Sequence, residues 1–113
     1  MATPADAELL ATIRATEKLR REAYDKEAMR EIKEAREAMS NREYQEAARH
    51  YGIAIKLLND RPASKKLRKE CEQGIAEGLY RAAMEEEETG RRERAVKLME
   101  KAVEMRHPKA RKQ

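Results

Sequence analysis

The sequence predicts an all-α protein of antiparallel helical hairpins, with four to five helices. Charged residues make up 42% of the chain, and the bias toward Ala, Glu, Lys, Arg and Leu is typical of long helices. Only four Gly and three Pro occur in 113 residues, too few for the frequent turns of a β protein. Apolar residues recur at steps of three and four, which is the spacing of amphipathic helices.

Length and composition limit the core. The chain suffices for one domain but not for two independent cores, so we expect a single helical domain over 1–108 and a basic flexible tail at 109–113. Phe and Trp are absent, so small aliphatic residues and four Tyr must fill the interior. The single cysteine, Cys71, excludes an internal disulfide and indicates a reducing compartment, cytoplasmic or nuclear. The sequence shows neither a secretion signal nor a transmembrane segment.

The first helix is predicted to begin at Pro4, because Thr3 can cap it and proline fits the first helical position. Its apolar stripe becomes sparse over residues 16–24. Both one helix over 4–39 and two helices that meet near 24–26 are compatible with this pattern, and the weak stripe favours a break or bend.

Ser40 and Glu43 mark the sharpest predicted boundary, because they have the spacing of a capping box at a helix start. The helix after them should end before Pro62, which cannot continue the hydrogen-bond ladder. Its apolar face consists of residues at helical spacing: Tyr44, Ala47, Tyr51, Ile55 and Leu58.

A third helix is predicted from Ser64, a possible cap, to the turn at Gly90, and a fourth from there to Pro108. Gly74 and Gly78 lie one turn apart inside the third helix. Because an interior glycine costs a helix about 1 kcal/mol relative to alanine, two of them indicate that another backbone comes close.

Two segments resemble the second helix of a tetratricopeptide repeat, in which small residues let paired helices approach and an aromatic residue fills the gap. They are Tyr44, Ala47, Tyr51, Ala54 with Pro62, and Gly90, Ala95, Met99, Ala102 with Pro108. Ala95 follows Ala47 by 48 positions against a repeat of about 34, which requires an extended third helix. The resemblance, strongest over 24–108, implies a hairpin array that binds a peptide or helix. Asn41 and Asn59 fall at helix ends, so the carboxylate clamp of chaperone-binding members looks absent.

An extended third helix also resembles the microtubule-interacting and trafficking (MIT) domain, an antiparallel three-helix bundle. This resemblance covers 24–88 and rests on Ala35, Tyr44, Ala47, Tyr51, Ile55, Leu67, Cys71 and the run Tyr80-Arg81-Ala82. It implies docking of short helical motifs from membrane-remodelling filament subunits in grooves between helices. The tetratricopeptide-like array is favoured because it also accommodates the fourth helix.

The sequence offers little for catalysis. His50 and His107 are far apart, and neither has a neighbouring Cys or Asp at ligand spacing, so no zinc or nucleophile site can be assembled from them. Glycine-rich phosphate loops are absent. We therefore expect a non-enzymatic protein without cofactor or metal. The carboxylates at 85–88 indicate a solvated helix end with a basic neighbour such as Arg91 or Arg92.

The candidate partner-binding residues are apolar side chains outside the main faces and a line of basic ones. Ile53 and Leu57 lie off the Tyr51 face, and Tyr80 and Met84 lie off the main apolar face of the third helix, which carries Ile75. These side chains are either covered on a second side by neighbouring helices or form an exposed binding patch. At about 100° per residue, a basic line, either solvated or facing an acidic partner, is formed by Arg42, Arg49 and Lys56.

Basic charge gathers at the C-terminus. Residues 91–113 carry nine Lys or Arg against three Glu, a net +6, which leaves −2 for residues 1–90. Nucleic acid or an acidic surface could bind there through Arg106, Lys109, Arg111 and Lys112.

The leading hypothesis for function is an adaptor that binds a peptide or helix of another protein in a groove between hairpins. Self-association through the charged first helix and electrostatic binding by the tail are the alternatives.

Overall fold

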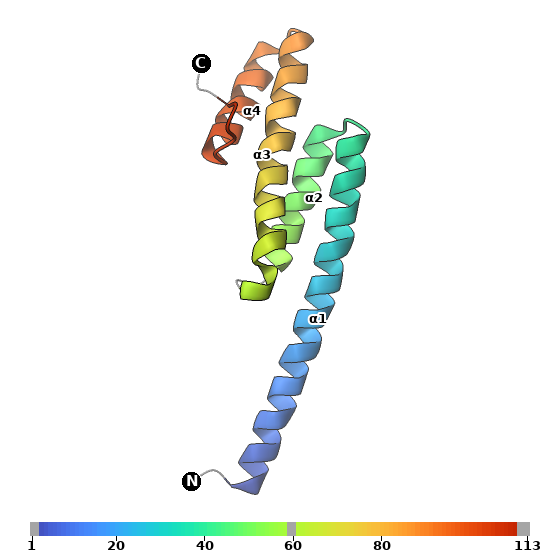
Figure 1. The fold of residues 1–113 in the computed structure, drawn as a ribbon, viewed down its shortest axis with the longest axis vertical. Coiled ribbons are helices and arrows are strands. Elements are labelled where there is room, and N and C mark those ends of the chain that lie inside the picture. The colour runs from blue at the N-terminus through green and yellow to red at the C-terminus, as the bar shows by residue number, and fades with distance from the viewer. Residues whose placement is uncertain (1–2, 59–60, 111–113) are drawn as a thin grey trace.

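The computed structural model describes residues 3–58 and 61–110, and within these ranges its secondary structure is entirely helical (Figure 1). The elements are α1 (Pro4–Ser40), α2 (Tyr44–Leu57), a 3-10 turn η1 (Pro62–Ser64), α3 (Lys65–Glu88) and α4 (Arg92–Glu104). Each α-helix packs against the next, so α2 and α3 are covered on two sides. The predicted all-α fold of antiparallel hairpins is confirmed. Across the same ranges, no helix is both long and apolar enough to cross a membrane.

The first helix, α1, is one continuous helix of 37 residues, so the break predicted near 24–26 does not occur. Thr3 caps it as predicted: its hydroxyl accepts the Asp6 amide at 3.2 Å, and the Asp6 carboxylate accepts the Thr3 amide at 3.1 Å. Residues 3–24 are all exposed, and full burial begins at Ala28. The sparse stripe therefore marks the edge of the packed body rather than a break in the helix.

The turn between α1 and α2 lies where it was predicted, but the predicted capping box is wrong. Ser40 is the last residue of α1, and Glu43 occupies the N-cap position of α2 without a side-chain cap. Arg42 adopts a left-handed backbone with φ of 60°, and the Glu43 amide donates to the Ala38 carbonyl at 2.8 Å. This backbone conformation and hydrogen bond are those of a Schellman motif. The motif supplies donors for the last carbonyl groups of α1, and the Ser40 hydroxyl takes no part in it.

The ends of α3 and α4 use the same motif. Gly90, with φ of 81°, turns the chain after α3, and the Arg91 amide donates to the Glu86 carbonyl at 2.8 Å. The Arg91 side chain forms an ion pair with the Glu86 carboxylate, which confirms the predicted basic neighbour of the acidic helix end. Arg106 takes the left-handed position after α4, with φ of 59°. Ser64 precedes α3 as predicted, but its hydroxyl forms no cap.

The main core is thin and lies where α1, α2 and α3 meet. Its buried members are Ala28, Ile32, Ala35, Tyr51, Ala54, Leu58 and Cys71. Ile32 and Cys71 are the largest fully buried side chains. Burial raises the pKa of the Cys71 thiol to about 11, so this residue stays protonated at neutral pH and packs as a small apolar group, as predicted.

Two glycines allow α3 to approach α2 closely. A Cβ added at Gly78 would lie 2.8 Å from the Tyr44 carbonyl oxygen, and one at Gly74 would lie 2.4 Å from the ring of Tyr51. The predicted close approach of another backbone is confirmed at Gly78, whereas Gly74 makes room for an aromatic ring.

Candidate functional site

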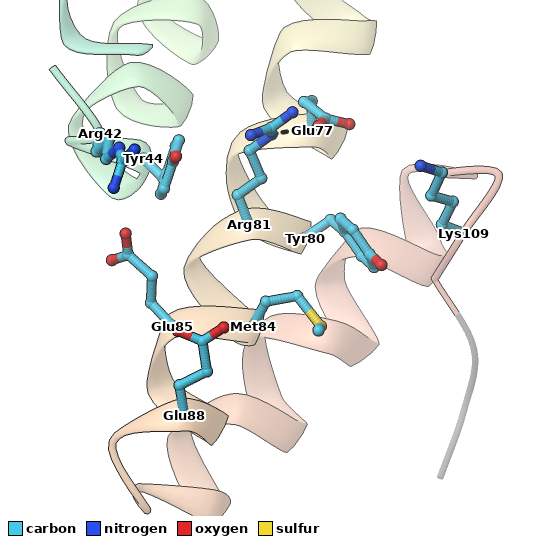
Figure 2. Close-up of a pocket in the computed structure, with 9 residues that line it drawn as sticks. All are labelled: Arg42, Tyr44, Glu77, Tyr80, Arg81, Met84, Glu85, Glu88 and Lys109. Atoms are coloured by element: carbon cyan, nitrogen blue, oxygen red, sulfur yellow. Dashed lines mark hydrogen bonds and ion pairs between the residues drawn. The ribbon is translucent and has the colours of Figure 1, made fainter. Parts of the chain in front are cut away.

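A cleft of about 460 Å³ crosses α3 between the start of α2 and the segment after α4 (Figure 2). It brings together four of the predicted binding residues, namely Arg42, Tyr80, Met84 and Lys109. The other lining residues are Tyr44, Glu77, Arg81, Glu85 and Glu88. Residues separated by up to 67 positions along the chain thus share one surface, which we call the α3 cleft.

Aromatic and methionine side chains form the centre of the α3 cleft. Tyr80 stacks on the His107 ring, with centroids 4.3 Å apart and planes inclined by 12°. Met84, one turn further along α3, is 39% exposed. The Arg81 guanidinium lies 5.8 Å from the centroid of the Tyr44 ring, within the range of a cation–π contact. The cleft therefore offers an apolar surface that solvent can reach.

Charged groups in the α3 cleft fall into two sets. Glu77 accepts hydrogen bonds from Arg81 and His107, so its charge is matched inside the protein. Burial raises the pKa of Glu77, but these hydrogen bonds outweigh burial and hold the pKa below its usual value. The second set forms no side-chain hydrogen bond or ion pair within the described ranges and comprises Arg42, Glu85, Glu88 and Lys109.

His107 holds one wall of the α3 cleft in place, a role that its position in the sequence did not indicate. The residue is 7% exposed. Its Nδ1 accepts the Lys109 amide at 3.0 Å, and because an amide can only donate, Nε2 carries the proton that it donates to Glu77. Residues that were expected to begin a flexible tail are therefore folded back toward α3. Local spacing could not reveal a contact between positions 30 apart.

Acidification should weaken this contact. Since the folded-state pKa of Glu77 is lowered, its contribution to stability is complete above the ordinary value of 4.5 and disappears as the pH falls through the lower folded value. We expect Glu77→Gln to reduce the loss of stability below about pH 5 by no more than ~1 kcal/mol, because the carboxylate is partly screened by solvent. Thermal unfolding between about pH 3 and 7 measures this. Glu72→Gln, at an exposed position of α3, is the control; an equal change there would contradict the assignment.

The other predicted residues on α2 lie outside the α3 cleft. Ile53 and Leu57 are half-buried, and Leu57 packs against the core, which favours cover by neighbouring helices over an exposed patch. Arg49 pairs with Glu46 at 2.8 Å, and Lys56 is exposed. The predicted basic line is wrong at its first member, because Arg42 precedes α2 in the left-handed turn and does not share its helical spacing.

Of the four basic C-terminal residues predicted to bind a partner, two border different hollows and two lie outside the described residues. Arg106 is exposed and borders a second hollow of about 540 Å³, which reaches Lys69 and Glu72 on α3. Lys109 lines the α3 cleft. Arg111 and Lys112 lie outside the described residues, so their predicted role stays a prediction.

Three groups able to bind a metal ion meet where α1 packs on α2. Donor atoms of Glu31, Glu34 and His50 lie within 4.8 Å of one another. Spacing along the sequence did not reveal this group, because both carboxylates come from α1 and the imidazole from α2. However, the His50 Nδ1 already bonds Glu31 at 2.6 Å, and the Arg49 guanidinium, 3.4 Å from Nε2, disfavours a nearby cation. In this arrangement the group ties α1 to α2.

None of the protein-family models, curated protein sequences or solved structures compared with the chain matches it. The resemblances to tetratricopeptide repeats and to the MIT domain therefore rest on the residue pattern and on the helical hairpin architecture.

Proposed function

We propose that the protein is a non-catalytic adaptor that binds a peptide or helix of another protein in the α3 cleft. The observation that carries this proposal is an accessible Tyr80–Met84 surface next to four charged side chains that no described residue neutralises. A small-molecule pocket is mostly apolar, whereas six of the nine lining residues here are charged. A polypeptide, which carries both apolar and charged side chains, fits this lining better.

The charges define the partner further. Arg42 and Lys109 favour acidic side chains, and Glu85 with Glu88 favours basic ones. Between them, Met84 offers an adaptable apolar contact. We therefore propose a segment with one apolar anchor flanked by charges of both signs. Such a segment gains affinity from the anchor and orientation from the charges.

A tetratricopeptide-like array is the family architecture that we propose. α4 packs on α3 as a second hairpin, and both Ala47 and Ala95, which carry the resemblance, are buried. The 24 residues of α3 supply the extra length that the alanine spacing requires. An MIT-like site is the alternative and would need only residues within 24–88, so binding there should not depend on Lys109. A cytoplasmic or nuclear setting is proposed because the thiol of Cys71 is unpaired and buried.

Selection of peptides from a display library, followed by fluorescence anisotropy, tests the adaptor proposal. Met84→Glu should lower the affinity for the selected peptides by about 10- to 100-fold, because it places a charge in the apolar centre of the cleft. Met29→Glu is a matched control, since Met29 on α1 is 40% exposed and Met84 is 39% exposed.

Equal losses of peptide affinity in both methionine variants would contradict the assignment of binding to the α3 cleft. Retained binding in Met84→Glu with loss in Lys109→Glu and a steep salt dependence would favour the electrostatic alternative. Loss in Met84→Glu with no effect of Lys109→Glu would favour an MIT-like site.

A further inference from the structure

The N-terminal half of α1 projects from the packed body as a lone helix (Figure 1). Every side chain over residues 3–24 is exposed, and several are large and apolar: Leu9 at 59%, Leu10 at 48%, Ile13 at 45% and Leu19 at 67%. Helices draw most of their stability from tertiary packing. This half of α1 therefore lacks the contacts that normally hold such a segment.

Small and apolar residues in this segment alternate at steps of four and three, which is the spacing of a coiled-coil seam. The seam positions are Ala5, Leu9, Thr12, Thr16, Leu19 and Ala23. The two threonines do not interrupt it, because Thr12 donates its hydroxyl to the Glu8 carbonyl at 3.0 Å and Thr16 donates to the Thr12 carbonyl at 2.9 Å. Each hydroxyl is satisfied within the helix, which leaves a methyl group for packing.

The seam and the core-facing side of α1 point in different directions. At about 100° per residue, the seam lies more than about 100° around the helix from the line of Ala28, Ile32 and Ala35. That line, continued toward the N-terminus, passes Arg21, Glu17, Arg14 and Leu10. A helix laid along the seam therefore approaches from a side that α2 and α3 do not occupy.

We propose that two copies of the protein pair through this seam as an antiparallel coiled coil. With Leu9 of one copy opposite Leu19 of the other, Ala5 faces Ala23 and Thr12 faces Thr16. Each seam position thus meets a residue of matching size. The two folded bodies then lie at opposite ends of the paired segment and do not collide, whereas a parallel pair would bring them side by side. The pairing is independent of the α3 cleft.

Charge supports the antiparallel direction. Residues 4–13 carry Asp6 and Glu8 and no basic residue, whereas 14–21 carry four basic residues against one Glu. In this register Asp6 flanks Arg20 of the second copy, twice by symmetry. A parallel pair places neither residue opposite an unlike charge. A like-charged contact between Glu8 and Glu22 of the second copy is left on the other flank, also twice by symmetry.

Sedimentation equilibrium of the full chain at up to about 1 mM tests the pairing. We expect a dimer, weakened at least about 100-fold by Leu9→Glu, which buries an unpaired charge in the seam. Leu10→Glu, at a position about 140° around the helix from the seam, should leave the dimer intact. Glu22→Lys should tighten it roughly threefold to tenfold, because a like-charged contact becomes an ion pair. Circular dichroism checks that each variant stays helical.

Disulfide cross-linking tests the direction. A mixture of Ala5→Cys and Ala23→Cys proteins should give the mixed cross-link, while Ala5→Cys alone should not link to itself. The buried Cys71 stays out of this reaction. A monomer at every concentration would overturn the proposal. Binding of a different protein to the seam, without any dimer, would overturn it too. So would equal effects of Leu9→Glu and Leu10→Glu, or cross-links between two copies of Ala5→Cys.

Discussion

Replacement of Ile32 by alanine should lower the free energy of unfolding by about 2–5 kcal/mol. Ile32 is fully buried where α1, α2 and α3 meet. Three of the other six buried members of that core are alanines, whose short side chains cannot fill the cavity. Since domains of this size are stable by only about 5–15 kcal/mol, the substitution should remove a large share of the total.

Urea denaturation followed by circular dichroism measures this loss. Leu10→Ala is the control, because Leu10 is 48% exposed and lies off the proposed seam, so its effect should stay within about 0.5 kcal/mol. Comparable losses for the two variants would show that Ile32 is not at the centre of the core.

The second large effect is expected at Gly78. A Cβ there meets the Tyr44 carbonyl oxygen at 2.8 Å and the Ala48 Cβ at 3.2 Å, and the backbone cannot yield without moving α2. Gly78→Ala should therefore cost about 1–3 kcal/mol through overpacking, even though alanine is the better helix former. Thermal or urea unfolding measures the change.

Gly52→Ala provides the matched control. Gly52 also lies inside a helix, α2, but a Cβ there meets no atom within 4 Å. This variant should gain about 0.5–1 kcal/mol, because alanine reduces the freedom of the unfolded chain and no contact opposes it. The two substitutions should thus act with opposite signs. Stabilisation by both would contradict the close packing of α3 on α2.

Much of the architecture could be predicted from local pattern. The face around Ala47 and Tyr51, the break at Pro62 and the turn at Gly90 each follow from the chemistry of one or two residues. The start of α2 could not be read from Ser40, because the Schellman turn through Arg42 already satisfies the end of α1. An arginine in a left-handed conformation carries no local signal comparable to that of glycine.

The α3 cleft was predicted only in part, for a related reason. Periodicity showed that Tyr80 and Met84 lie off the main face of α3, but not which residues lie beside them. The stacking of His107 on Tyr80 and the pairing of His50 with Glu31 join different helices. Contacts of this kind depend on how helices pack, which single-helix spacing does not determine.

The most direct test of the adaptor proposal is methyl NMR of the methionines during titration with a selected peptide. The Met84 methyl should shift with the binding curve while the Met29 methyl, at similar exposure on α1, stays constant. An unchanged Met84 methyl at saturation, with shifts confined to other methionines, would contradict binding in the α3 cleft.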